Sequence, residues 1–262
     1  MIELINSEQD LARQKFEVLV PTMGALHAGH QSLIKLGRTF SDSLLTTIFV
    51  NPLQFENKDD LAKYPKTLDL DLKLAEEAGA CAVFAPSVEV VYPTQMQTIS
   101  AGAVGDLYEG ASRAGHFAGV LTVVKRFFDL TKPKYAIFGE KDFQQLFLIK
   151  QMVQQLALPI EIIAAPIIRE ADGLAMSSRN SRLTQADRKA ALIISKALQQ
   201  SNLEEMHKEL ETEPGFKLDY LAEIDEQSFG PVVADTQYRR VIIAGWVNGV
   251  RLLDNKRMGS QA

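Results

Sequence analysis

The sequence is poor in cysteine, in basic residues relative to acidic ones, and in long apolar runs. Cys81 is the only cysteine among 262 residues, so no disulfide can form within the chain, and a reducing compartment is expected. The apolar neighbours of Cys81 predict that it is a small core residue. The formal net charge of −5 is opposite in sign to the basic excess that nucleic-acid binding usually needs.

Membrane and metal signals are lacking as well. No apolar run approaches the roughly 20 residues that a membrane-spanning helix requires, and Met1–Leu4 lack the basic start of a signal peptide. We therefore expect a cytoplasmic protein with no nucleic-acid and no membrane partner. The chain has four histidines, which disfavours a histidine-rich metal centre, and the sequence assigns no metal ligands.

The first two-thirds of the chain alternates strand and helix patterns. Short apolar segments rich in Val, Ile and Phe predict buried strands, and helical spacing of apolar residues fills the intervals. This alternation predicts an α/β fold with a doubly wound parallel sheet, which binds ligands outside the carboxyl ends of its strands. His27, Asn51, Pro86 and Gly139 follow strands and should lie there. The predicted strands are 16–21, 43–50, 80–85, 134–138 and 159–164, and the helices are 29–40, 67–79, 117–131 and 142–157.

The pattern changes after about residue 168. A polar stretch, Ala171–Asn180, leads into a helix over about 184–200 that begins with a capping box of Thr184 and Asp187. Strands are predicted at 218–224, 240–244 and near 250–253. The sequence thus predicts a Rossmann-like domain over residues 1–168 and a smaller α+β carboxy-terminal domain over residues 169–262.

The most specific motif is Pro21–His30, a small-residue turn between a strand and a helix start. His27 and His30 are three residues apart and share one helix face. The amino end of a helix attracts anions, and histidine changes charge near neutral pH. The pair therefore suits hydrogen bonding to phosphate oxygens, although a plain pair on a helix face or half of a metal site would have the same spacing.

Three further polar segments follow predicted strands or the domain boundary. Asn51-Pro52-Leu53-Gln54 offers two amides to a polar substrate, or is only a turn. Gly139–Gln145 combines a glycine, a lysine suited to phosphate and an aspartate that is either a ribose acceptor or a helix cap. Met176–Asn180 places two hydroxyls beside a guanidinium, which suits phosphate or a polar linker. Arg113–Val120 is a candidate lining loop, and Glu56–Asp71 is a solvated face or a lid.

Together these segments resemble the pantothenate synthetases, the pantoate–β-alanine ligases of the nucleotidylyltransferase superfamily. The resemblance runs in order along nearly the whole chain. Ala28 departs from the family pattern, because an acidic residue is common between the two histidines. The segments that carry the resemblance are Pro21–His30, Phe49–Phe55, Tyr64–Leu70, Phe84–Pro86, Gly115–Val124, Phe138–Leu146, Arg169–Asn180 and Arg251–Asn255.

The resemblance implies a reaction in two steps. ATP and D-pantoate give pantoyl adenylate and pyrophosphate, and β-alanine then attacks the acyl carbon to give pantothenate and AMP. It also implies a cytoplasmic homodimer that uses ATP as co-substrate and needs Mg²⁺. Catalysis of the first step depends on positioning and on fixed positive donors around the α-phosphorus.

The resemblance also implies roles for individual residues. His30 is the expected catalytic proton donor, with His27 beside it. Gln54 and Gln145 are expected to hold pantoate, Gln54 also to lie near β-alanine, and Asn51 to contribute to the substrate site. The other expected catalytic residues are Lys141, Ser177, Ser178 and Arg179. The expected ATP-binding residues are Met23, Gly24, Ala25, Leu26, His27, Ala28, Gly29, His30, Gly139, Glu140, Lys141, Asp142, Ile168, Met176, Ser177, Ser178 and Arg179.

Three alternatives share parts of this pattern. Another adenylyltransferase of the same superfamily would keep the histidines and Ser177–Arg179, but not the two glutamines with Asn51. A class I aminoacyl-tRNA synthetase has a similar histidine motif, but this chain is short and acidic. A nucleotide sensor without turnover would have no need of both histidines, Lys141 and Arg179.

Overall fold

The computed structural model describes residues 2–55, 61–62, 64–93 and 97–259. The chain divides into two compact units, and the first comprises Met1–Glu140 and Gln145–Pro166. The second comprises Ile167–Ala262 together with the four residues Lys141–Gln144. The sequence places a boundary at residue 168 and gives no sign that Lys141–Gln144 belongs with the second unit. None of the described helices is long and apolar enough to cross a membrane.

The first unit is built on a six-stranded parallel sheet, which confirms the predicted doubly wound fold. The strand order is β1-β4-β3-β2-β5-β6, and every pairing in it is parallel. The sequence does not predict the edge strand β1, because it has three residues of which two are exposed. The strands are β1 (Glu3–Ile5), β2 (Val18–Thr22), β3 (Leu44–Ile48), β4 (Ala82–Phe84), β5 (Tyr135–Gly139) and β6 (Glu161–Ala165).

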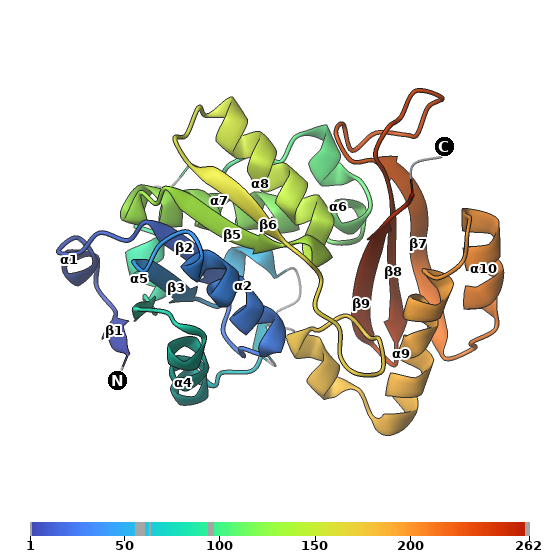
Figure 1. Cartoon of the computed structure of the whole chain (residues 1–262), viewed down its shortest axis with the longest axis horizontal. Helices are drawn as coiled ribbons and strands as arrows, with labels where there is room; N and C mark the ends of the chain where they lie inside the picture. The colour runs from blue at the N-terminus through green and yellow to red at the C-terminus, as the bar shows by residue number, and fades with distance from the viewer. Residues whose placement is uncertain (1, 56–60, 63, 94–96, 260–262) are drawn as a thin grey trace. The chain divides into compact units, whose positions relative to one another are not determined.

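Helices cover both faces of this sheet (Figure 1). On one face, Ile34 of α2 and Ala75 of α4 pack with Val18 and Val20 of β2. On the other face, the ring of Phe127 on α7 lies edge-on to Phe84 of β4. The helices are α1 (Glu8–Leu11), α2 (Ala28–Arg38), α4 (Leu68–Ala78), α5 (Val88–Val91), α6 (Glu109–Ser112), α7 (His116–Thr131) and α8 (Phe143–Gln155), with 3-10 turns η1 (Pro52–Gln54), η2 (Ala103–Asp106) and η3 (Glu140–Asp142).

The prediction that Cys81 is a core residue is wrong. The thiol is exposed and donates a hydrogen bond to the carbonyl oxygen of Asp42. The apolar run around Cys81 forms a shorter strand than predicted, because β4 begins only at Ala82.

The strand order reverses between β2 and β5, and these two strands separate toward their carboxyl ends. They pair only through Val18 with Tyr135 and Leu19 with Ala136. By contrast, β5 and β6 stay paired as far as Gly139 and Ala165. The carboxyl ends at such a reversal are where doubly wound sheets bind ligands.

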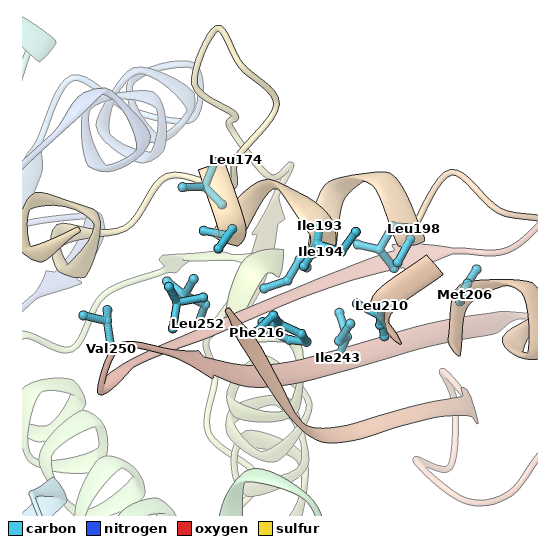
Figure 2. Packing of buried hydrophobic residues seen from close by; sticks show 14 of the residues in the cluster. Leu174, Ile193, Ile194, Leu198, Met206, Leu210, Phe216, Ile243, Val250 and Leu252 are labelled. Carbon is cyan, nitrogen blue, oxygen red and sulfur yellow. The ribbon is translucent and has the colours of Figure 1, made fainter. Parts of the chain in front are cut away.

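The second unit is a three-stranded antiparallel sheet with helices on one face, as the α+β prediction requires. Its core joins Ile193 and Ile194 of α9 and Leu210 of α10 to Phe216 and Ile243 of the sheet (Figure 2). The sequence does not predict the helix α10, because charged residues fill it around three apolar positions. The elements are η4 (Ser178–Arg182), α9 (Gln185–Ala197), α10 (Leu203–Glu211), β7 (Phe216–Asp225), β8 (Arg239–Val247) and β9 (Val250–Arg257), and the predicted capping box at Thr184 is confirmed.

Candidate active site

Two histidines form the amino-terminal cap of α2. Nδ1 of His27 accepts a hydrogen bond from the backbone N–H of Gly29 at 3.1 Å, and Nδ1 of His30 accepts one from the N–H of His27 at 3.4 Å. The two ring centroids are 4.0 Å apart. Because Nδ1 acts as an acceptor in both rings, a neutral ring carries its proton on Nε2, which is then a donor. The cap therefore gives both imidazoles the same tautomer at a positive helix end.

A buried aspartate shapes the turn before these histidines. Asp71 of α4 is 1% exposed and accepts hydrogen bonds from the backbone N–H groups of Ala25 at 3.0 Å and Leu26 at 2.7 Å. Gly24 has φ +81°, and a Cβ there would lie 3.0 Å from Asp71 Oδ2. The carboxylate of Asp71 thus holds the turn that precedes the histidines. Of the predicted lid 56–71, residues 56–60 and 63 lie outside the described part of the chain.

Asn51 orients Gln54 at the end of β3. The side-chain N–H groups of Asn51 donate to Gln54 Oε1 at 3.0 Å and to the carbonyl oxygen of Gly119 at 3.1 Å. Its oxygen accepts from the N–H of Leu53 at 3.2 Å and from the hydroxyl of Tyr92. Burial raises the pKa of Tyr92, which keeps that hydroxyl a donor. Asn51 thus uses its donors and acceptors within the protein, where it orients the Gln54 amide.

Among the described residues, the acceptor of the Gln54 amide nitrogen is a weak one. The nitrogen donates to the thioether sulfur of Met23 at 2.8 Å, and a thioether is a weak acceptor. The backbone of Gln54 is held as well, because His116 Nδ1 donates to its carbonyl oxygen at 2.9 Å. Arg113 Nη1 in turn lies 3.0 Å from His116 Nε2. An oxygen of a bound substrate would be a better partner for the Gln54 amide than sulfur is.

The predicted segment 139–145 is divided between the two units. Gly139 ends β5, and Glu140 and the half-buried Gln145 belong with the first unit. Lys141 and Asp142 belong with the second unit, and Lys141 Nζ lies 3.6 Å from Asp142 Oδ2.

In the second unit, Lys141 shares a partly open pocket with the predicted serine and arginine segment. Ser177 caps η4 by accepting from the N–H of Arg179 at 3.2 Å, and the N–H of Met176 donates to the carbonyl oxygen of Ile168 at 2.9 Å. Residues with ammonium, guanidinium and hydroxyl groups line this pocket, which suits an anionic ligand. The lining residues are Lys141, Leu174, Ala175, Ser177, Arg179, Asn180, Ile194, Arg251, Leu252, Leu253 and Asp254.

Ion pairs fix the loop that carries this segment. Arg169 binds Asp254 through two hydrogen bonds of 2.6 and 3.0 Å. Arg188 donates to Asp172 at 2.6 Å, and this hydrogen bond holds the pKa of Asp172 below its ordinary value. Asn180 is buried and donates to Glu170 Oε1 at 2.7 Å. The sequence singles out the loop but not these partners, because Arg169 and Asp254 are far apart in the chain.

The described residues include no group of three or more His, Cys, Asp or Glu side chains that could hold a metal ion. A divalent cation that accompanies a nucleotide needs no such group, because Mg²⁺ is usually bound through phosphates and one or two carboxylates.

The doubly wound sheet, with a histidine-capped helix at the reversal of strand order, defines a Rossmann-like α/β protein. A sequence model of the family "Pantoate-beta-alanine ligase" matches residues 2–257. The chain therefore belongs to the pantoate–β-alanine ligase family, and as a member it is a ligase that forms a C–N bond.

Individual relatives agree with this assignment over almost the whole chain. Pantothenate synthetase from Chloroherpeton thalassium is 43% identical over 258 residues, covering 92% of this chain and 90% of the relative. The enzyme of the same name from Corynebacterium glutamicum is 44% identical over 263 residues, covering 94% of each chain.

Solved structures of the same kind are similar too. Pantothenate synthetase from Thermus thermophilus has a TM-score of 0.91 at 37% identity, covering 97% of this chain and 99% of that one. The ligase from Francisella tularensis, complexed with β-γ ATP and β-alanine, has a TM-score of 0.84 at 35% identity, covering 98% of this chain and 97% of that one.

Proposed function

We propose that the protein condenses D-pantoate with β-alanine at the expense of ATP, giving pantothenate, AMP and pyrophosphate through a pantoyl adenylate. The observation that carries this proposal is the histidine-capped helix at the reversal of strand order, in a chain of this family. The relative from Francisella tularensis, with its bound ATP analogue and β-alanine, supports the two co-substrates.

In the first step, an oxygen of the pantoate carboxylate attacks the α-phosphorus of ATP, and the bond to the departing pyrophosphate breaks. Negative charge grows on the phosphate oxygens, and donors fixed in advance stabilise it without reorganisation. His27 and His30 meet this need, because the cap directs their Nδ1 atoms to the backbone and leaves Nε2 as the protonated nitrogen.

The residues proposed to bind ATP are Met23–His30, Gly139, Glu140, Lys141, Asp142, Ile168 and Met176–Arg179. Lys141, Ser177 and Arg179 line one pocket, which supports a shared role on the phosphates. Mg²⁺ is proposed to be held by the phosphate oxygens, where it would offset their negative charge.

Pantoate is proposed to bind to Gln54 and Gln145, with Asn51 holding the Gln54 amide in place. In the second step, the amine nitrogen of β-alanine attacks the acyl carbon, and AMP leaves with the electrons of the broken C–O bond. The amine enters in its neutral form with Gln54 near it, and the proton that its nitrogen loses as the amide forms passes to water. We also propose a cytoplasmic homodimer.

The direct test is to mix the purified protein with ATP, Mg²⁺ and D-pantoate and to follow pyrophosphate, and then to add β-alanine and follow AMP and pantothenate. Pyrophosphate release that depends on pantoate, and AMP release that depends on β-alanine, are the expected results. Nucleotide binding with neither product would overturn the proposal in favour of a sensor.

The catalytic roles are tested by substitution. His30→Ala and Lys141→Ala should each lower the rate of pyrophosphate release by about 10² or more, because each removes a donor to the transition state. His207→Ala is the matched control, because His207 is an exposed histidine that pairs with Glu211 on α10. Rates near that of the unmodified protein in both test variants would contradict the assignment.

The pantoate site is tested on α8. Gln145→Ala should raise the KM for pantoate several-fold while the KM for ATP stays within about twofold, because one hydrogen-bonding amide is lost. The exposed Gln154 of the same helix provides the control substitution Gln154→Ala. An unchanged KM for pantoate would remove Gln145 from the substrate site.

A further inference from the structure

The backbone of Lys141 is held by the far end of the chain. The side-chain nitrogen of Asn255, on β9, donates to the carbonyl oxygen of Lys141 at 2.9 Å. Asn255 is 2% exposed, so this hydrogen bond is protected from water. The contact lies within the second unit, to which Lys141–Gln144 belongs.

The amide of Asn255 has a fixed orientation. Its oxygen accepts from Nη1 of Arg240, and because a guanidinium can only donate, the opposite end of the amide must be the nitrogen that faces Lys141. The backbone N–H of Asn255 also donates to Asp254 Oδ1 at 2.8 Å, the carboxylate that Arg169 binds.

The same arginine holds the other end of the Lys141–Gln144 segment. The guanidinium of Arg240 lies over the ring of Phe143, 4.0 Å from its centroid. That ring in turn stacks on Phe229 at 6.2 Å and 19°. Arg240 therefore contacts the segment directly at Phe143 and indirectly, through Asn255, at Lys141.

The charges behind this arrangement are deeply buried. Arg240 is 3% exposed, and its Nε donates to Glu226 at 2.7 Å. A buried ion pair is often no more stabilising than apolar side chains of similar size, because desolvation offsets the attraction. Folding stability alone is therefore a weak reason for this arrangement. A directional chain of hydrogen bonds, by contrast, fixes the position of the Lys141 carbonyl group.

We infer that Asn255, oriented by Arg240, is a positioning residue that sets the place of Lys141 for the phosphates of ATP. Leu252, Leu253 and Asp254 of the same strand line the pocket that Lys141 shares with Ser177 and Arg179. Fixing the Lys141 backbone to this strand thus fixes the point from which its side chain extends toward the other donors. This inference rests on the proposed role of Lys141.

The test compares Asn255→Asp and Asn255→Ala with the unmodified enzyme. Asn255→Asp keeps the size of the side chain and the acceptor for Arg240, but an oxygen replaces the nitrogen that faces the Lys141 carbonyl. Asn255→Ala removes the hydrogen bond without adding a charge. Both variants should raise the KM for ATP about tenfold and leave the KM for pantoate within twofold. The inhibition constant of adenosine, which has no phosphate for Lys141 to bind, should not change.

Two comparisons complete the experiment. Arg257→Gln removes the exposed donor to Glu226 without touching Asn255, and it should leave the KM for ATP unchanged. Lys141→Ala, by contrast, should raise the KM for ATP. If Lys141→Ala raises the KM for ATP and neither Asn255 variant does, the positioning role is overturned and the proposed function stands.

Other outcomes are equally decisive. Equal weakening of ATP and adenosine in the Asn255 variants would show a general structural role and overturn the inference. An unchanged KM for ATP together with an unchanged rate of pyrophosphate release in Lys141→Ala would overturn the proposed role of Lys141 itself. Thermal unfolding of each variant shows whether the protein measured is folded.

Discussion

At the scale of the residue, the site depends on side chains that serve the fold and the chemistry at once. Asn, Asp, Ser and Thr are the usual helix caps, yet α2 is capped by His27 with His30 completing the box. Each imidazole gives Nδ1 to the backbone, which determines the tautomer at Nε2. The helix cap therefore uses Nδ1 and the proposed catalysis uses Nε2 of the same ring, so a substitution can remove one function and keep the other.

His27→Asn should separate these two uses. Asparagine is a good cap, so the thermal midpoint should stay close to that of the unmodified protein, whereas the rate of pyrophosphate release should fall by about 10² because the Nε2 donor is gone. His27→Ala should lose the same activity and also about 1 kcal/mol of stability. Thermal unfolding and the pyrophosphate assay measure the two effects, and full activity in His27→Asn would contradict the proposed role.

At the scale of the element, close packing of α7 against η1 supports Gln54. A Cβ on Gly119 would lie 2.4 Å from the carbonyl oxygen of Leu53 and 2.8 Å from the backbone nitrogen of Gln54. The backbone carbonyl of Gly119 also accepts from Asn51. A glycine at this position therefore allows the helix to approach the turn that carries Gln54.

Gly119→Ala should displace η1. We expect a loss of about 1–3 kcal/mol of stability, as for other overpacked sites, and a several-fold rise in the KM for pantoate. Gly259→Ala is the control, because no atom lies within 4 Å of a Cβ built there. Denaturant unfolding and steady-state kinetics test this, and a variant with an unchanged KM for pantoate would show that η1 does not position the substrate amide.

Elements also show what the sequence can and cannot predict. It predicts the central strands and the long helices, because continuous apolar runs and helical spacing are local signals. The edge strand β1 and the charged helix α10 lack such signals. The sequence also singles out His27, Gln54 and Lys141 by their place after strands. It does not reveal Asp71 or Asn255 as their supports, because those contacts join residues distant in the chain.

At the scale of the whole molecule, both units bury charged side chains beside an apolar core, and Asp71 is an example in the first unit. Apolar side chains fill the described core of the first sheet on the face covered by α2 and α4. In the second unit, α9 and α10 cover an apolar face (Figure 2), but Arg240, Asp254 and Asn255 are buried as well. The stability of the second unit therefore depends on the ionisation state of its carboxylates as well as on apolar packing.

This dependence predicts a response to acid. Burial alone would raise the pKa of Glu226, but hydrogen bonds from Arg257 and Arg240 outweigh it and hold the pKa below 4.5. A carboxylate with a lowered pKa in the folded state stabilises the protein above its unfolded pKa, and that contribution is lost as the pH falls through the folded value. Thermal midpoints should therefore fall less steeply below pH 4.5 in Glu226→Gln than in the unmodified protein. Parallel curves would show that Glu226 contributes nothing to acid sensitivity.

The lone exposed thiol has a practical consequence. Cys81 immediately precedes β4, so it lies at the amino edge of the parallel sheet, whereas His27 and Asn51 follow their strands at the carboxyl edge. A maleimide dye would therefore attach at one defined position, on the edge of the sheet that lies away from these two residues. The unmodified chain could thus be labelled or tethered to a surface away from these residues, without any cysteine being added or removed.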